Sequence, residues 1–386
     1  MDASHPLMFE VRRRSGGMSG PSRADGIKVP KGEEQALREQ TGGSEMKTSR
    51  TVVGVDTAKR VFQLHWVDME TGEIVDLKLT RAKFLEHFAN LAPCVVAMEA
   101  CGGSQHWARQ LRELGHDPWL LPAKAVRPFV FGNKNDAHDA RAIWTAAQMP
   151  GIRTVAVKSE EQQAILALHR MRQQLVKFRT AQINGLRGLL TEYGEVMPQG
   201  RAGMRRDVPQ ALARVSERLP AIVIDTLREQ WARIGRLDEE IGEIERRIGV
   251  WHRGNADSKR VAEIPGVGVL TATAVVAAMG DPAAFRSGRE FAAWLGLVPR
   301  HDGTGGRVRM LGISKRGDRY LRTLLIHGAR SVLTNAKAPP EWAVRLAERR
   351  PANVVTVALA NKTARTIWAL LAHDRAYRAN YVSQPA

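Results

Sequence analysis

An apolar stripe along one long helical segment is the feature that most constrains this chain. Its members recur at steps of three and four residues: Leu227, Trp231, Ile234, Leu237, Ile241, Ile244 and Ile248. Because a long helix cannot bury such a face alone, it needs another helix to pack against. We therefore expect residues 159–255 to form a long helical arm, as a coiled coil or a helical hairpin, with an ordinary amphipathic core helix as the alternative. Between the two helices we expect a basic loop, PQGRAGMRRDVPQ.

Short apolar runs before the arm predict strands. Three of them, TVVGVD, RVFQLHWVD and GEIVDLKL, are joined by tight connections and predict an antiparallel meander. After a helix near residues 81–92, two further strands are expected at CVVAME and PWLL, with a helix from 104 to 114 between them. A last helix carries Asp136 and Asp139. Strands followed by alternating helices and strands predict an α/β domain with a mixed sheet, which we assign to residues 47–158.

Four acidic residues of this domain lie at positions where a negative charge is energetically unfavourable. Asp56 ends the first strand and Glu99 the fourth, and open α/β sheets bind ligands beyond the carboxyl ends of their strands. Asp136 and Asp139, in GNKNDAHDARAI, share one helix face, where like charges repel. All-oxygen ligands suit Mg²⁺ or Mn²⁺, so we expect these four acids to hold metal. For the helical pair alone, the competing interpretation is two solvated acids at a helix N-terminus.

The charge of the whole chain predicts a polyanionic partner. The formal net charge is +18, and basic residues recur along the whole sequence, which is the pattern of a nucleic-acid-binding protein. Residues 1–46 lack apolar periodicity and are expected to be a disordered extension. With no long apolar run and no signal-peptide core, we expect a cytoplasmic protein that has no membrane partner. Cys94 and Cys101 are expected to be reduced, buried thiols.

Two glycine-containing motifs mark the last part of the chain, residues 256–386. In IPGVGVLTATAVVAAMG, Gly266 and Gly268 precede an apolar helix, so backbone amides could approach a phosphate there. This pattern is typical of a helix-hairpin-helix DNA-binding element in a mainly helical domain. A tight turn between two core helices is an equally good interpretation.

The second motif is a glycine-rich loop with cations and two hydroxyl groups, Thr304 and Ser314. Its cations, and those of the helix that follows, are expected to bind nucleic acid: Arg300, Arg307, Arg309, Lys315, Arg316, Arg319 and Arg322. A hydroxyl among arginines could act as a nucleophile on phosphorus, because cations stabilise the charge that develops. The simpler interpretation is a hydroxyl that hydrogen-bonds a phosphate.

Five segments together resemble a known family. VVGVDTAK, VVAMEACGGSQHWARQL, NKNDAHDARAI, IPGVGVLTA and GISKRGDRYLRTLLIHGAR occur in the order found in bacterial insertion-sequence transposases with a DEDD motif, the bridge-RNA-guided recombinases. The resemblance covers about residues 50–335. It implies a ribonuclease H-like domain of the RuvC type, an oligomerising coiled-coil arm and a C-terminal transposase domain. By motif, Asp56 is the first acid, Glu99 the second, and Asp136 and Asp139 the last two, all holding Mg²⁺.

The resemblance also implies partners and a nucleophile. The partners are donor and target DNA, a noncoding guide RNA, and further copies of the chain as a homodimer that assembles to a tetramer, near the bacterial nucleoid. The family's nucleophile is a serine of the glycine-rich loop, but this loop reads Gly303-Thr304-Gly305-Gly306. We therefore expect Thr304 as the nucleophile, with Ser314 as the alternative.

Two other functions compete with this interpretation. A junction endonuclease of the RuvC type would use the four acids without a covalent intermediate. An actin-like ATPase or sugar kinase is suggested by GVDTAK, which is similar to the first phosphate loop of that fold. The kinase interpretation needs a second glycine-rich phosphate loop, which we do not find, and it leaves the net charge of +18 unexplained.

Overall fold

The structure is a computed structural model, and it describes residues 50–130, 136–304 and 307–379. The expected disordered extension, residues 1–46, lies outside the described residues, as does the start of the acidic motif, residues 132–135. Within the described ranges, no helix is long and apolar enough to cross a membrane.

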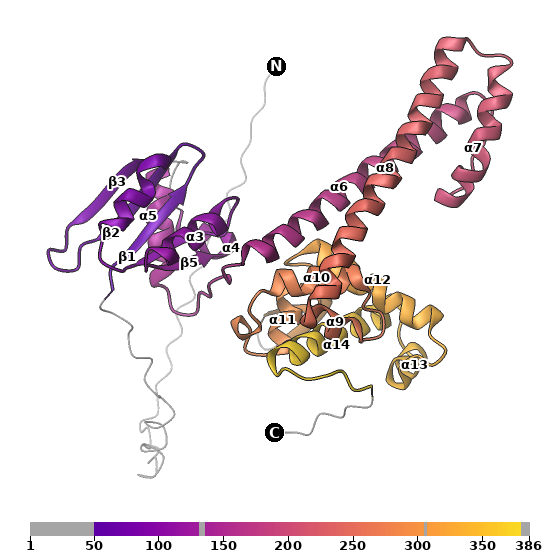
Figure 1. Ribbon diagram of the computed structural model, residues 1–386. Helices are drawn as coiled ribbons and strands as arrows, with labels where there is room; N and C mark the ends of the chain where they lie inside the picture. Colours follow the sequence, from indigo (N-terminus) through magenta and orange to yellow (C-terminus); the bar gives the residue numbers. More distant parts are fainter. Residues whose placement is uncertain (1–49, 131–135, 305–306, 380–386) are drawn as a thin grey trace, which may run out of the picture. The chain divides into compact units, whose positions relative to one another are not determined.

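The described part of the chain before the arm forms a mixed sheet of five strands, in the order β3-β2-β1-β4-β5 (Figure 1). The strands are β1 (Val52–Thr57), β2 (Val61–Val67), β3 (Ile74–Thr80), β4 (Val95–Glu99) and β5 (Asp117–Leu121). β1, β2 and β3 pair antiparallel, whereas β4 runs parallel to both β1 and β5. The predicted meander and mixed sheet are confirmed.

Helices cover both faces of this sheet. They are η1 (Arg81–Lys83), α2 (Phe84–Ala89), α3 (Ser104–Glu113), α4 (Ala123–Val126), η2 (Arg127–Phe129) and α5 (Asp136–Gln148). Val55 and Met98 pack with Phe84 of α2 and Trp107 of α3 in one core. Alternate strand residues turn to the other face, where Ala97 and Leu121 pack with Ala142, Ile143 and Ala146 of α5. The period of two in the strands therefore determines which side chains meet α5.

The arm consists of α6 (Glu160–Glu192), α7 (Arg201–Ser216) and α8 (Ala221–Gly254). α6 and α8 lie side by side and run antiparallel, because Arg172 pairs with Glu245 at 2.6 Å and Arg179 pairs with Asp238 at 2.7 Å (Figure 1). At intervals of seven residues the predicted stripe is buried: Leu227, Ile234, Ile241 and Ile248. The helical-hairpin alternative is the one observed. These four residues are buried within a single chain, whereas Trp231, Leu237 and Ile244 are partly buried.

The expected basic loop between the two long helices is wrong, because most of it forms helix α7. Its buried side chains follow a helical spacing and pack with Ile224 and Leu227 of α8: Met204, Val208, Ala211, Leu212 and Val215. Pro209 lies inside the helix, where a proline costs about 3 kcal/mol. Burial of this apolar face outweighs that cost, and the surrounding arginines concealed the pattern in the sequence.

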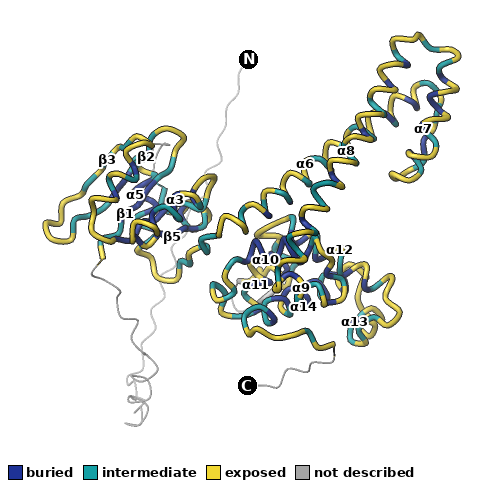
Figure 2. The backbone as a smooth tube through the Cα atoms, viewed as in Figure 1, coloured by how far each residue is buried: buried dark blue, intermediate teal, exposed yellow. Residues whose placement is uncertain are grey.

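The remaining described residues form a mainly helical domain, as expected. Its elements are α9 (Ala256–Ala262), α10 (Val269–Met279), η3 (Pro282–Ala284), α11 (Gly288–Trp294), β6 (Pro299–Thr304), β7 (Arg307–Ile313), α12 (Arg319–Asn335), α13 (Glu341–Ala347) and α14 (Ala352–Ala372). The residues of α10 from Thr271 to Met279 are buried, and Figure 2 colours this helix mainly dark blue.

The glycine-rich loop differs from the sequence prediction because β6 and β7 pair antiparallel as a hairpin. Thr304, the last residue of β6, is the register partner of Arg307. The sequence signal for β7 is the alternation Arg307-Val308-Arg309-Met310 after a Gly-Gly pair, a pattern typical of a strand.

Candidate functional site

Asp56 and Glu99 lie next to each other at the carboxyl edge of the sheet. Their preceding neighbours, Val55 and Met98, are partners in the parallel β1–β4 register. Both acids are partly buried, and by strand alternation they share the face that packs on α5. Just beyond them, Thr57 Oγ1 lies 3.5 Å from Cys101 Sγ, so the two strand ends stay close after the acids.

A glycine sets the distance between this edge and α5. A Cβ atom at Gly54 would lie 2.5 Å from the carbonyl oxygen of Ala140 and 2.6 Å from the amide nitrogen of Trp144. α5 therefore approaches β1 more closely than any other residue at position 54 allows. Asp139 precedes Ala140 and is partly buried, and Asp136 is the first residue of α5. This contact brings the helix that carries both aspartates to the edge where Asp56 and Glu99 lie.

The donor chemistry of these acids fits a hard divalent cation, since carboxylate oxygens are the ligands that Mg²⁺ and Mn²⁺ prefer. The side chain of Asp136 lies outside what the structure describes. Among the described side chains, no group of three or more His, Cys, Asp or Glu residues is close enough to hold a metal ion. The backbone places the acids on one edge, and their assignment as ligands stays a prediction.

The two cysteines differ. Cys94 is buried as expected, and burial raises the pKa of its thiol to about 11. The expectation for Cys101 is wrong, because this residue is exposed just after the carboxyl end of β4. Cys101 is followed by Gly102 and Gly103, so no apolar run surrounds it in the sequence.

Cations surround the backbone of Thr304. Arg307 is its register partner, and Arg309 is the partner of Asp302. Arg300, Arg307 and Arg309 are exposed, so this hairpin presents positive charge to solvent. The side chain of Thr304 itself lies outside what the structure describes.

Ser314 occupies a tight turn. Its amide donates to the carbonyl oxygen of Val298 at 2.8 Å, and its partly buried hydroxyl accepts from the amide of Arg316 at 3.5 Å. Lys315 has a φ of 53°, and a Cβ at Gly317 would lie 1.8 Å from the carbonyl oxygen of Trp294. The turn is thus pressed against the end of α11, while Lys315, Arg316 and Arg319 stay exposed.

Comparison with known proteins settles the family. The model of the transposase IS116/IS110/IS902 family matches residues 258–343, and a DEDD transposase model of the IS110 type matches residues 53–195. A probable family 20 transposase of Pseudomonas aeruginosa is 48% identical over 331 residues, which span 84% of this chain and 98% of that protein. The chain belongs to the IS116/IS110/IS902 family of transposases.

Two further relatives are also transposases of insertion sequences. The transposase for insertion sequence element IS1111A of Coxiella burnetii is 42% identical, with 85% of this chain and 91% of the relative covered. The transposase for element IS1328 of Yersinia enterocolitica is 38% identical, with 82% and 96% covered. The protein is therefore a DNA-processing enzyme of an insertion sequence, and the actin-like kinase interpretation is dropped. The DEDD match spans all four acids, and the other match spans Thr304 and Ser314.

One expected nucleic-acid contact of this transposase is corrected. Arg322 is only 9% exposed, and its Nη1 donates to the carbonyl oxygen of Leu295 at 2.9 Å. It lies on the face of α12 that also buries Leu321 and Leu325. Arg322 therefore links α12 to the end of α11, and its guanidinium is not on the surface available to nucleic acid.

The turn before α10 favours the packing interpretation for one glycine of the transposase. Gly266 has a φ of 83°, and a Cβ there would lie 2.6 Å from the carbonyl oxygen of Gly328 in α12. Gly268 is exposed, with no heavy atom within 4 Å of a Cβ at that position. Gly266 thus serves the close approach of α12, and phosphate binding by a helix-hairpin-helix at Gly268 stays a prediction.

Proposed function

We propose that this transposase cleaves DNA by divalent-metal-dependent phosphoryl transfer at a site formed by Asp56, Glu99, Asp136 and Asp139. The observation that carries the proposal is the β1–β4 register, which puts Asp56 beside Glu99, together with the contact of Gly54 on α5. A bound Mg²⁺ or Mn²⁺ would stabilise negative charge on the phosphate and on the leaving oxygen. The carboxylates hold and orient the ion, and β1, β4 and α5 keep them in place.

Titration of the full chain with Mn²⁺, followed by electron paramagnetic resonance, tests the metal part directly. We expect Mn²⁺ binding by the parent and weaker binding by Asp56→Asn, Glu99→Gln and Asp139→Asn. Glu113→Gln, an exposed acid of α3 in the same domain, is the matched control and should bind as the parent does. Equal binding by all these variants would refute the metal site.

The covalent step in this proposal uses the Thr304 hydroxyl. Its oxygen forms a bond to the phosphorus of a DNA phosphodiester, one P–O bond of the DNA strand breaks, and the hydroxyl proton ends on the leaving oxygen. The exposed guanidinium of Arg307, opposite Thr304 in the hairpin register, supports this assignment because a cation stabilises the phosphate under attack. Ser314 is the alternative, although its hydroxyl belongs to the turn against α11.

The partners in this proposal are donor and target DNA and a noncoding guide RNA. The net charge of +18 and the exposed Arg300, Arg309, Lys315, Arg316 and Arg319 support nucleic-acid binding. Sequencing of RNA that copurifies with the protein tests the guide. A single enriched RNA species is expected, and its absence from active protein would contradict the RNA-guided mechanism.

Assembly to a dimer and then a tetramer also belongs to the proposal. Because the stripe of α8 is used inside the hairpin, the contact between copies must use other residues. Met171 and Phe178 are candidates: they are 55% and 48% exposed, and they stand seven residues apart on α6.

A RuvC-type junction endonuclease remains a second candidate, favoured by the absence of a serine from the sequence Gly303-Thr304-Gly305-Gly306. That activity needs the acidic edge but no nucleophilic side chain. Junction cleavage by a Thr304→Ala, Ser314→Ala double variant at the parent rate, with no protein–DNA adduct in the parent, would establish it.

A further inference from the structure

A cavity of about 430 Å³ lies between the arm and the helical domain, and its lining residues include neither the four acids nor Thr304. It opens to solvent and is lined by α6, α10, α11 and α12 and by the residues just before α6 and α12. Its volume falls in the range of roughly 300–1,000 Å³ that is usual for small-ligand sites. The residues that give it chemical character are Lys158, His169, Arg170, Trp294, Arg319 and Tyr320.

A linear series of hydrogen bonds holds one wall of the cavity. Thr273 donates its hydroxyl to the carbonyl oxygen of Val269 at 2.7 Å, so its oxygen accepts from His169 Nε2 at 3.0 Å. The other ring nitrogen, Nδ1, then accepts from the Tyr320 hydroxyl at 2.9 Å. Burial lowers the pKa of His169 to about 4, so the ring is neutral near pH 7. His169 is fully occupied and joins α6 to α10 and α12.

Positive charge at the cavity is not neutralised. Among the described residues, no acidic side chain pairs with Lys158, Arg170 or Arg319. The one carboxylate at the rim, Asp318, accepts from the amides of Tyr320 and Leu321 at 2.7 and 3.0 Å, as the cap of α12. Burial, with a contribution from the charge of Arg170, lowers the pKa of Lys158. A cation held at a cost in this way favours a bound anion.

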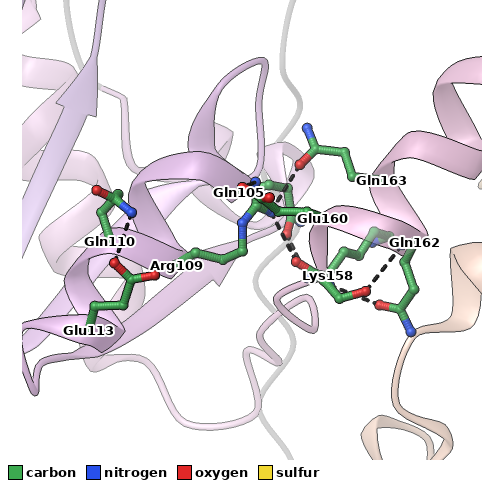
Figure 3. Close-up of polar contacts among 9 residues, drawn as sticks. Gln105, Arg109, Gln110, Glu113, Lys158, Glu160, Gln162 and Gln163 are labelled. Carbon is green, nitrogen blue, oxygen red and sulfur yellow. Dashed lines mark hydrogen bonds and ion pairs between the residues drawn. The ribbon is translucent and has the colours of Figure 1, made fainter.

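The backbone of Lys158 is fixed on both sides by α3, as Figure 3 shows. Its amide donates to Gln105 Oε1 at 2.7 Å, and its carbonyl oxygen accepts from Arg109 Nη1 at 3.0 Å. Arg109 also donates to Gln163 of α6 at 2.9 Å. The backbone position from which the Lys158 side chain reaches the cavity is therefore set by its hydrogen bonds with Gln105 and Arg109 of α3.

An aromatic ring completes the cavity. Trp294, at the end of α11, is 37% exposed although it is a large apolar side chain. It stacks on Phe291 with ring centroids 5.7 Å apart and an interplanar angle of 19°. Phe291 holds the Trp294 indole in place beside cations. Such an arrangement suits a nucleotide, because the base can stack on the ring while the phosphate contacts the cations.

We propose that this cavity holds one unpaired nucleotide of the bound nucleic acid, with its base against Trp294 and its phosphate between Lys158, Arg170 and Arg319. The ligand class is a nucleotide outside a paired helix, from DNA or from RNA. The proposal rests on the nucleic-acid binding of the proposed function, but it uses neither the four acids nor Thr304. Binding measured in EDTA therefore tests the cavity independently of cleavage.

The probe is 2-aminopurine, whose fluorescence falls when it stacks on an aromatic ring. Three oligonucleotides carry it: a DNA duplex with the probe unpaired, the same duplex with the probe paired, and a single-stranded RNA. We expect the full chain to quench an unpaired probe and to bind it more tightly than the paired duplex. Trp294→Leu should reduce the affinity for the unpaired probe about tenfold and abolish the quenching. Trp294→Phe keeps an aromatic ring and should retain both the affinity and the quenching.

Two matched lysine variants distinguish binding in the cavity from general electrostatic attraction of nucleic acid. Lys158→Gln should reduce the preference for the unpaired probe and lower the slope of log affinity against log salt by about 1. Lys177→Gln, the exposed cation two turns along α6 from Arg170, should leave the preference and the quenching unchanged. Stronger binding of the unpaired DNA probe identifies DNA as the source of the nucleotide, and stronger binding of the RNA probe identifies RNA.

Three results would overturn the proposal: no quenching by the parent, no preference for an unpaired probe, or Trp294→Leu and Lys158→Gln variants that behave as the parent does. Asp139→Asn should keep full binding to the cavity probes. If this variant loses cleavage but keeps quenching, the two proposals stand separately. If the cavity variants bind normally while the parent cleaves DNA, the inference about the cavity alone is wrong.

Discussion

Gly54 of β1 lies directly against Ala140 of α5, where a Cβ atom at Gly54 would come within 2.5 Å of the Ala140 carbonyl oxygen. This contact joins β1, the strand that carries Asp56, to α5, the helix that begins at Asp136 and carries Asp139. The spacing of the proposed metal site therefore depends on a residue that cannot bind metal.

Gly54→Ala tests this dependence. The added methyl group must push α5 away from β1, which should cost about 1–3 kcal/mol of unfolding free energy and reduce cleavage more than stability alone explains. Gly242→Ala is the control, because a Cβ at that position in α8 meets no heavy atom within 4 Å. The control should be neutral or more stable by up to about 1 kcal/mol. Chemical denaturation and a cleavage assay measure both effects, and a fully active Gly54→Ala variant would show that the contact does not position the acids.

A charged residue in the apolar stripe of α8 should unfold the hairpin with α6 rather than dissociate an oligomer. Ile241 is 4% exposed in the hairpin with α6, so Ile241→Asp should cost at least about 2 kcal/mol and reduce helicity. Ile222→Asp changes an exposed isoleucine at the start of the same helix and should have little effect. Circular dichroism during thermal unfolding compares them. A fully folded Ile241→Asp variant would place the stripe at a contact between copies.

A charge at Phe178 tests assembly separately. Phe178→Glu should leave the hairpin folded, because the side chain is 48% exposed, and should dissociate the oligomer. Light scattering measures the mass of the parent and the variant. An unchanged oligomer would exclude Phe178 from the contact.

Acid should destabilise the helical domain through His169. Burial lowers the pKa of this ring from an ordinary 6.5 to about 4, so the unfolded chain takes up a proton below about pH 6.5 while the folded chain resists it down to about pH 4. Stability should therefore fall as the pH is lowered through this window, by on the order of 3 kcal/mol from this residue. In His169→Gln, unfolding free energy measured from pH 7.5 to 4 should depend less on pH. An unchanged dependence would contradict the buried neutral ring.

Thr304 carries the most specific chemical prediction. Thr304→Ala should form no covalent protein–DNA adduct, whereas Thr304→Ser should form at least as much as the parent, because serine lacks the methyl group that crowds the oxygen. Ser314→Ala should still form the adduct. Denaturing gels with labelled DNA measure the adduct, and DNA binding measured in parallel should be unchanged. An adduct in Thr304→Ala that disappears in Ser314→Ala would transfer the role to Ser314.

Local patterns in the sequence were sufficient for the sheet and for the acidic edge. Short apolar runs, with a period of two in RVFQLHWVD, predict β1 to β5, and they place Asp56 and Glu99 at the carboxyl ends of β1 and β4. The sequence does not mark Gly54 as important, because its role depends on α5, more than eighty residues further along the chain. Contacts between distant segments leave no periodic signal in one sequence.

The sequence predictions that the structure corrects, for α7 and Arg322, also depend on contacts between distant segments. The arginines and Pro209 hid helix α7, whose apolar residues are buried only when α8 is present. Arg322 resembles its exposed neighbour Arg319, yet it faces the core because of its position on α12. The nucleotide cavity joins Lys158, Trp294 and Arg319, and nothing in the sequence indicates that these three residues meet.

Metal-dependent cleavage by single amide variants tests the central claim most directly. The parent should cleave DNA carrying the ends of its insertion sequence in Mg²⁺ or Mn²⁺ and should be inactive in EDTA. Asp56→Asn, Glu99→Gln, Asp136→Asn and Asp139→Asn should each lower the rate by roughly 100-fold or more while the folded fraction stays unchanged, because each removes part of the electrostatic support for the transferring phosphate. Glu113→Gln should cleave as the parent does. Cleavage by the parent in EDTA, or by all four amide variants at the parent rate, would contradict catalysis at this edge of the sheet.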